Sequence, residues 1–254
     1  MKKVFVTILS VLAVASMVCS CKKDNKNQGG KNNGGGEETT EVITIDGKFT
    51  DWDALKDVAV SEVPEVATER CNMLLMKGTA DSDNIYLYFE YQLAEDEEGN
   101  LQKEAPFDIF FDADGNSSTG FISWIWSKEG CGWDYLCETE GGILKDGAIA
   151  SLSDMNIYRA DTYTDAAGVQ IDGWDTGAVQ TKLDLKDFAE AAGTVKNGIA
   201  MFEVSILRSV INANKKGSVG VGITISDADW NTMGVLPLGE SGVGEAEFMQ
   251  IAIP

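Results

Sequence analysis

Histidine is absent from the 254-residue sequence. Triads of the Ser-His-Asp type, cysteine nucleophiles with an imidazole base and histidine-ligated zinc all need this side chain. These classes of active site are therefore excluded. Glycoside hydrolysis by two carboxylates needs no histidine, but with 41 acidic residues a suitably spaced pair is expected by chance. The composition therefore gives a hydrolase no support, and we expect a protein that is not an enzyme.

Basic residues are scarce. The sequence has 20 lysines and arginines against 41 acidic residues, for a formal net charge of −21 at pH 7. Nucleic acids and anionic lipid surfaces are bound by clustered lysine and arginine. The charge balance argues against both partners and leaves neutral ligands, or cations, to be considered.

Long apolar runs are missing except near residue 1. Lys2 and Lys3 precede a mainly apolar stretch, residues 4–18, which is too short to cross a bilayer comfortably. This pattern predicts a signal peptide over residues 1–20. The stretch ends in Val-Cys-Ser-Cys, and Cys21 resembles the lipid-modified cysteine of bacterial lipoproteins. An ordinary secretion signal that contains cysteine is the alternative.

Residues 22–41 contain no large apolar side chain and are rich in glycine, asparagine and lysine. Such a segment cannot build a core, so we expect residues 21–41 to be a lipidated cysteine followed by a flexible linker. The folded domain is expected over residues 42–254, held at the membrane through the lipid anchor only. The expected location is a bacterial outer membrane, facing the cell surface or the periplasm.

Two of the remaining cysteines are close in sequence. Cys131 and Cys137 are six residues apart in a glycine-containing segment, and an oxidising compartment would allow a disulfide between them. Free thiols are the alternative. No second pair of cysteines or histidines exists, so the spacing excludes a zinc site.

Apolar and polar residues alternate with a period of two through most of residues 42–254, which indicates half-buried β-strands. In the clearest run, residues 85–93, the odd positions are apolar, and Tyr86 and Tyr88 point to the opposite face. The other alternating segments are residues 107–111, 200–206, 219–225 and 249–253, and residues 72–79 are the expected hairpin partner of 85–93. We predict an all-β fold, a single antiparallel β-sandwich of immunoglobulin-like or jelly-roll-like type.

Helical signal is confined to two short segments. Residues 182–193 would give two or three turns that end at Gly193. Residues 205–217 would give a short helix that ends at Asn214 or Gly217. We therefore expect one or two short helices beside the sandwich.

Asp112, Asp114 and Asn116 occupy positions 1, 3 and 5 of a calcium-loop pattern. Position 6 should be glycine but is Ser117, and the glutamate of position 12 is also missing, so an EF-hand is excluded. A tight turn and a calcium site of another type stay open. Calcium needs six to eight oxygen ligands, so a second loop such as Asp227-Ala-Asp229 would have to contribute.

The chain resembles the family 9 carbohydrate-binding modules and their DOMON-like relatives in four segments that occur in the same order: ITIDGKFTDWDAL, DIFFDADGNSSTGF, GWDYLCE and VGVGITISDADWNTMGVLP. The resemblance covers nearly the whole span from Ile43 to Pro254. It implies a β-sandwich that binds sugars, and structural calcium in some members. Some relatives bind haem, for which this chain offers no histidine and only methionines such as Met73 or Met76.

Five of the six tryptophans are candidate ligand contacts. Trp174 and Trp230 lie in loops rich in aspartate and glycine, where a large ring is difficult to bury. We predict that both flank a sugar site at one loop end of the sandwich, with Asp229 hydrogen-bonding to sugar hydroxyls. Trp124 and Trp126 would lie about 7 Å apart on one face if residues 121–126 form a strand.

Core packing is the alternative for Trp124, Trp126 and Trp133. Trp52 is expected to be core or turn packing, because it belongs to the first of the four motifs. Tyr86 and Tyr88, on the outward face of their strand, are a weaker platform for a sugar.

Residues and resemblance together favour a membrane-anchored lipoprotein that binds carbohydrate without catalysis and serves a glycan-uptake or degradation system. A structural or partner-binding subunit of an outer-membrane complex, without a sugar ligand, is the alternative. A carboxylate-based glycoside hydrolase is a third candidate. Exposed aromatic side chains would favour the first, and a cleft with two facing carboxylates would favour the third.

Overall fold

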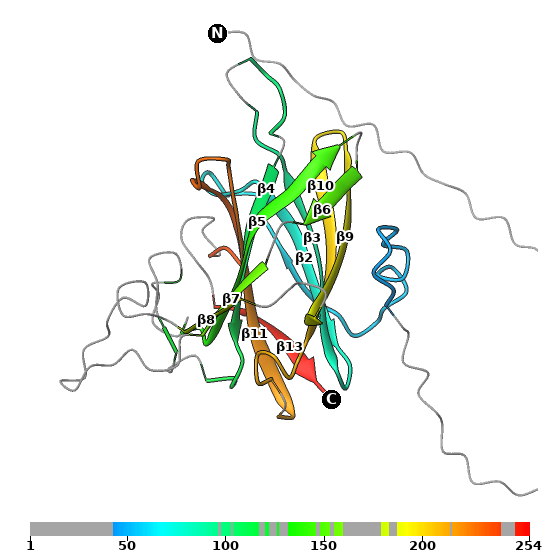
Figure 1. The fold of residues 1–254 in the computed structure, drawn as a ribbon, viewed down its shortest axis with the longest axis vertical. Coiled ribbons are helices and arrows are strands. Elements are labelled where there is room, and N and C mark those ends of the chain that lie inside the picture. Colours follow the sequence, from blue (N-terminus) through cyan, green and yellow to red (C-terminus); the bar gives the residue numbers. More distant parts are fainter. Residues whose placement is uncertain are drawn as a thin grey trace, which may run out of the picture. The chain divides into compact units, whose positions relative to one another are not determined.

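The alternating segments become the strands of an antiparallel β-sandwich in the computed structural model of the protein (Figure 1). The structure describes residues 43–95, 98–102, 104–116, 120–121, 126, 132–145, 148–152, 155–159, 179–182, 187–213, 215–239 and 247–254. All of its strands belong to the compact unit Thr40–Pro254. The predicted fold class is confirmed.

The strands form two layers. The first layer, in spatial order, consists of β1 (Ala59–Glu62), β2 (Met73–Ala80), β3 (Asn84–Gln92), β10 (Ile199–Leu207) and β9 (Ala189–Lys196). The second layer consists of β12 (Thr232–Leu236), β11 (Gly217–Ser226), β4 (Glu104–Asp112), β5 (Tyr135–Lys145) and β6 (Ala148–Leu152). Three further strands extend the second layer: β13 (Met249–Ile253) on β11, β7 (Met155–Arg159) on β5, and β8 (Val179–Lys182) on β7.

Backbone pairing ties the layers together at both sides. The pair Ala148–Thr194 joins β6 to β9. On the other side the bridge Cys71–Gly234 joins the start of β2 to β12, with the Asn72 amide donating to the Met233 carbonyl at 3.2 Å. These contacts cover strand edges that would otherwise present unpaired backbone groups.

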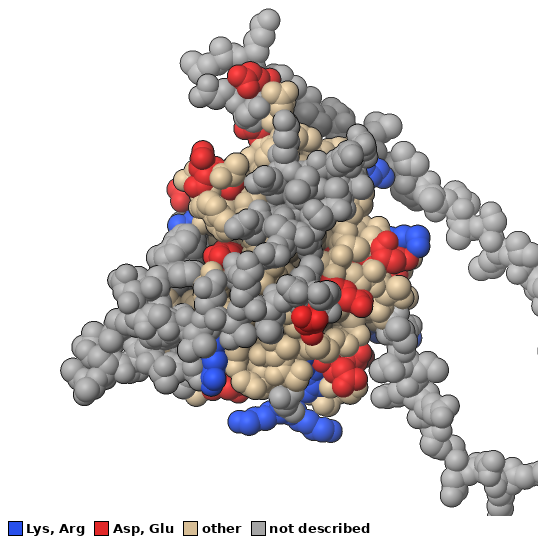
Figure 2. Space-filling model, viewed as in Figure 1, with Lys and Arg blue, Asp and Glu red and all other residues tan. Residues whose placement is uncertain are grey.

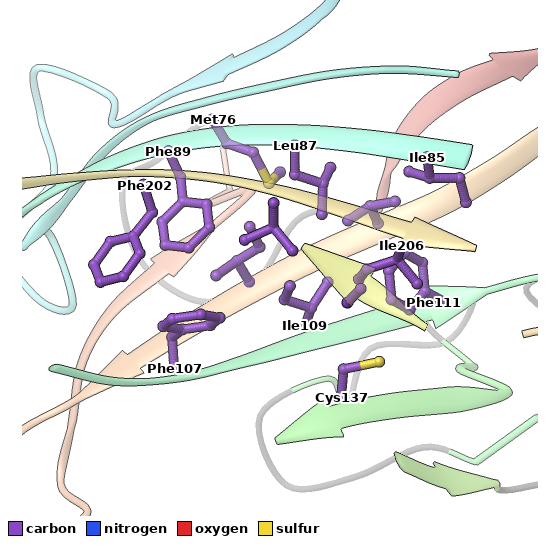
Figure 3. Close-up of a cluster of buried hydrophobic side chains, with 14 of the residues drawn as sticks. Met76, Ile85, Leu87, Phe89, Phe107, Ile109, Phe111, Cys137, Phe202 and Ile206 are labelled. Atoms are coloured by element: carbon purple, nitrogen blue, oxygen red, sulfur yellow. The ribbon is translucent and has the colours of Figure 1, made fainter. Parts of the chain in front are cut away.

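The main core lies between the layers, and the inward faces predicted from the alternation are confirmed. Ile85, Leu87 and Phe89 of β3 are fully buried and face Phe107 and Ile109 of β4 (Figure 3). Buried side chains of β10, β11 and β13 complete this core: Ala200, Phe202, Val204, Ile206, Val219, Val221, Ile223, Ile225, Met249, Ile251 and Ile253.

The C-terminal strand β13 fits against β2 because β2 has a glycine at the point of contact. A Cβ atom on Gly78 would lie 2.4 Å from Cδ1 of Ile251 and 2.9 Å from Cε of Met249. Glycine at this position therefore lets the side chains of β13 pack directly on the backbone of β2.

A second core covers the outer face of the second layer. Phe110 and Leu136 point outward from β4 and β5 and pack with Trp126, Trp133 and other apolar side chains, namely Phe121, Val235, Leu238 and Phe248. The indole of Trp126 lies over Gly222 of β11, where an added Cβ atom would be 2.4 Å from Cζ2 of that indole. Strands β4, β5 and β11 are therefore buried on both faces where this second core covers them.

Both predicted helices are wrong in their described parts. Residues 189–193 belong to β9, which pairs with β10 along its length, and residues 205–207 end β10. The turn that follows is fixed by Arg208, whose guanidinium donates to the carbonyls of Asp81 (2.6 Å) and Ala213 (2.9 Å). In the alanine-rich residues 189–193, the pairing of β9 with β10 therefore overrides the preference for a helix. Among the described residues no helix is long and apolar enough to cross a membrane.

Candidate functional site

The described loops gather at two ends of the sandwich. Ile225 pairs with Phe107 near one end, followed by the loop of residues 227–231, which contains Trp230; we call this the Trp230 end. Gly220 pairs with Asp112 near the other end, which we call the Asp112 end. The two ends are separated by the length of β11.

The turn of residues 227–231 holds Trp230 out from the sandwich. One carboxylate oxygen of Asp227 accepts hydrogen bonds from the amides of Asp229 and Asn231, both at 2.9 Å. The Asn231 side-chain amide donates to the other oxygen at 3.0 Å. Partial burial alone would raise the pKa of Asp227, but these hydrogen bonds lower it below its ordinary value. The turn is thus fixed by its own side chains.

Trp230 adopts a left-handed backbone conformation, φ 63°, which is costly for a bulky residue. Its side chain is nevertheless 47% exposed, so no buried contact offsets that cost fully. Val66 (60% exposed) and Leu101 (38%) lie in neighbouring loops at the same end. Three of the four large exposed apolar side chains among the described residues are therefore at the Trp230 end.

Exposed apolar surface of this kind suits the C–H face of a sugar ring, which is apolar as well. Asp229 stands next to the indole, is exposed, and has no side-chain partner in the described part of the chain. The structure therefore places the predicted Trp230 and Asp229 together on an accessible turn.

The other tryptophans considered as ligand contacts are either buried or outside the described residues. Trp126 is completely buried in the second core, so the prediction that it contacts a ligand is wrong. Trp133, also buried there, is a core residue as the alternative predicted, and Trp52 is buried in the first layer. Trp124 and Trp174 lie outside the described residues, and their proposed sugar contacts stay predictions.

The flanks of the Trp174 segment are described. Arg159 ends β7 opposite Tyr135, and Val179 begins β8 opposite Arg159. Tyr135 pairs with Phe111, so these flanks lie at the Asp112 end. The described flanks, Arg159 and Val179, therefore lie at the end of the sandwich opposite to Trp230.

At the Asp112 end three carboxylates converge. Oxygens of Asp112, Asp114 and Asp134 all lie within 4.8 Å of one another. Asp134 accepts hydrogen bonds from the amides of Ala113 (2.8 Å) and Asp114 (3.2 Å). Burial first, and then the negative charges of Asp134 and Asp114, raise the pKa of Asp112 to about 6. Mutual repulsion among ionised carboxylates is what a bound cation would relieve.

The tight turn predicted for this loop is also present. The Asn116 amide donates to Asp112 at 3.0 Å and to Asp114 at 2.8 Å, and Gly115 has a positive φ of 68°. Asn116 itself is exposed. An ionised carboxylate has about four lone-pair sites, so these hydrogen bonds leave others available for a cation.

The expectation that residues 227–229 supply further ligands to this cluster is wrong. Gly220, the partner of Asp112, precedes Asp227 by seven residues of extended chain, about 23 Å, so residues 227–229 cannot join the cluster. Asp134 supplies the third carboxylate, which sequence reasoning missed. The available signal in the sequence was that Asp134 directly precedes the strand that pairs with residues 107–111.

A pair of neighbouring carboxylates does occur, and both residues are partly exposed. Asp108 and Glu138 are register partners on β4 and β5. One oxygen of Asp108 is buried without a hydrogen-bond partner, and burial raises the pKa of Asp108 to about 8. The two carboxylates lie side by side on adjacent strands rather than facing each other across a cleft, so this pair does not support a hydrolase.

Cys137 is a free thiol that points into the main core, so the bridge to Cys131 considered above is absent. Burial raises the pKa of the Cys137 thiol, which keeps it protonated. Cys71 is also free. Cys131 lies outside the described residues.

No protein-family model and no curated protein matches the chain. Among solved structures, it is similar to a family 9 carbohydrate binding module from Caldicellulosiruptor kristjanssonii in complex with cellotriose, with 15% identity and a TM-score of 0.38; the match covers 84% of this chain and 89% of that chain. A family 9 module from the same organism in complex with glucose matches with 12% identity and a TM-score of 0.39, covering 84% and 92%. These structures belong to the family that the four sequence motifs resemble.

Proposed function

We propose that this protein binds carbohydrate without catalysis, at the Trp230 end of the sandwich. The observation that carries the proposal is the exposed indole of Trp230 on a turn that Asp227 fixes in a strained backbone conformation. A turn whose backbone is already fixed loses little conformational entropy on binding, which favours stacking of its indole on a sugar. Asp229 would accept hydrogen bonds from sugar hydroxyls beside the ring.

The charge of the described surface agrees with an uncharged ligand. On the face seen in Figure 2, acidic side chains are scattered and the basic ones form small separate groups. An exposed platform buries little area, so we expect affinities in the micromolar to millimolar range.

The test is to screen the protein on a glycan array and then to titrate Trp230→Ala with the bound glycan. Losing one stacked ring should cost roughly 1–2 kcal/mol, or about ten-fold in affinity. Because Trp230 is exposed, the melting temperature should hardly change. Val60→Ser, which alters an exposed apolar residue on β1, is the matched control and should leave binding intact. Unchanged glycan affinity in Trp230→Ala would contradict the proposal.

We further propose that Asp112, Asp114 and Asp134 hold a structural calcium ion. Three converging carboxylates supply oxygen ligands of the type calcium takes, and water or backbone oxygens would complete the shell. An ion there would fix the loop after β4 to the start of β5.

We also propose that Cys21 carries the lipid that keeps the domain at the outer membrane, in the service of a glycan-uptake or degradation system. The support is the sequence alone: an apolar stretch, a cysteine and a linker without apolar side chains. A linker of this length would let the sugar site reach roughly 25 Å from the membrane surface.

A further inference from the structure

A pocket of about 240 Å³ lies on the outer face of the first layer, away from the Trp230 end. Residues of β3, β10 and β9 form its floor, and Ile43 and Ile45 of the N-terminal segment form one wall. The residues that matter below are Asn84, Tyr86, Asp187, Glu190 and Ser205.

Three of these side chains stand in a row across neighbouring strands. Ser205 of β10 is the register partner of Tyr86 on β3 and of Glu190 on β9. Adjacent strands are about 4.8 Å apart, so a ring, a hydroxyl and a carboxylate line the floor at this spacing.

The ring of Tyr86 is held in place. Its hydroxyl donates to a carboxylate oxygen of Asp81 at 2.8 Å and accepts from the Asn84 side-chain amide at 3.4 Å. The tyrosine therefore offers a fixed aromatic wall rather than a mobile side chain.

Three polar groups of this pocket have no protein partner among the described residues. Ser205 is only 7% exposed, yet its hydroxyl makes no hydrogen bond to any described residue. The carboxylates of Asp187 and Glu190, at the rim, have no ion pair or hydrogen bond within the described part of the chain. Because the cavity opens onto the Ser205 hydroxyl, a ligand in the cavity could form the hydrogen bond that the described protein groups do not supply.

The lining also defines the ligand class. Two carboxylates and no basic residue line the pocket, so an anionic ligand would be repelled. Carboxylates, an amide and a hydroxyl match a ligand with many hydroxyls, and the Tyr86 ring matches an apolar ring face. At about 240 Å³ the cavity is smaller than the roughly 300–1,000 Å³ of pockets that take drug-sized ligands, which suits a single hexose unit.

We propose that this pocket is a second binding site, which takes one sugar residue without a negative charge. It rests on the carbohydrate binding proposed for the Trp230 end and extends it to a separate face. Two sites on one rigid domain would let the protein hold one polysaccharide at two points, which raises its effective affinity without new contacts at either site.

The test is a protein-observed NMR titration with methyl glucoside, methyl galactoside, methyl mannoside and methyl glucuronoside. We expect at least one neutral glycoside to shift the amide signals of Asn84, Glu190 and Ser205, and the glucuronoside to leave them unchanged. Ser205→Leu, which fills the floor, should abolish these shifts. Ser205→Ala, which preserves the fold more conservatively, and Glu190→Gln should each weaken binding by about ten-fold.

Glu62→Gln, an exposed carboxylate on β1, is the matched control and should change nothing. In Trp230→Ala the pocket shifts should persist, which separates the two sites. Neutral glycosides that shift only residues 227–231 would overturn this proposal and leave the first one standing. Pocket shifts that survive Ser205→Leu, or that the glucuronoside also causes, would overturn it as well. Shifts confined to the pocket would overturn the Trp230 site instead.

Discussion

The indole nitrogen of Trp52 donates a hydrogen bond to the carboxylate of Glu203, 3.2 Å away, although 151 residues separate them in sequence. The same carboxylate accepts from the amides of Asp46, at 2.6 Å, and Gly47. Glu203 is fully buried on the outer face of β10. One side chain thereby fixes the N-terminal segment, with its IDG and DW motifs, on the first layer.

Replacing Glu203 with alanine should therefore destabilise the domain. Three donors would lose a charged acceptor, and we expect the free energy of unfolding to fall by about 2–4 kcal/mol. Glu203→Gln keeps one acceptor oxygen and should cost less. Urea denaturation measures both variants, and Glu62→Ala, at an exposed position, should stay within about 0.5 kcal/mol of wild type. A loss below about 1 kcal/mol for Glu203→Ala would show that the segment is held by other contacts.

Calcium should stabilise the protein if the three carboxylates at the Asp112 end bind it. An ion that binds only the folded state, at a concentration about 100 times its dissociation constant, adds about 2.7 kcal/mol. The melting temperature should rise in millimolar calcium and fall again with chelator. Asp134→Asn should abolish this response, whereas Asp229→Asn, at the other end, should retain it. A wild-type melting temperature indifferent to calcium would leave the loop as a simple turn.

The buried carboxyl of Asp108 should make stability depend on pH. Its pKa is about 8 in the folded protein, because of burial and the charge of Glu138, against an ordinary value of 3.8. Between these two values the folded state keeps the proton that the unfolded state releases, so stability falls as pH rises from about 4 to about 8. Below this window the stabilisation is fully present.

The Asp108→Asn variant has no such proton to release, because its side-chain amide stays neutral at every pH in this window. The stability of the variant relative to wild type should therefore rise by more than about 1 kcal/mol between about pH 4 and about pH 8. Denaturation curves of both proteins across this pH range separate the contribution of Asp108 to stability from the contributions of other carboxylates. Parallel pH profiles would show that Asp108 is ionised in the folded state.

Lipidation of Cys21 is testable in cells. The wild-type chain should incorporate labelled palmitate and sediment with membranes. Cys21→Ala should lose the label, whereas Cys19→Ala should keep it, because only the cysteine next to the linker is the expected acceptor. Equal labelling of wild type and Cys21→Ala, or none in either, would refute the anchor.

Period-two patterning was sufficient to identify the main core. Ile85, Leu87 and Phe89 were assigned to the inward face, where they are fully buried. The same pattern failed to show that β4 and β11 are buried on both faces. Adjacent Phe110 and Phe111 were the available signal, since two consecutive buried aromatics indicate a strand without a solvent face.

The sites were predictable only where their residues are close in sequence. Trp230 and Asp229 share one turn, so the composition of the loop identified them. Asp134 lies 20 residues beyond Asp114, and only the pairing of β4 with β5 brings the two together. The pocket beside Tyr86 draws on β3, β9 and β10, and no single stretch of sequence contains its pattern.

The position of β13 has a consequence for when the domain can fold. Met249, Ile251 and Ile253 fill the main core and Ile251 rests on Gly78, so a chain that ends before β13 lacks part of that core. Domains fold as units once their elements are present. During synthesis the domain therefore stays incomplete until residue 253 has emerged. Its last strand delays folding until the whole domain is available.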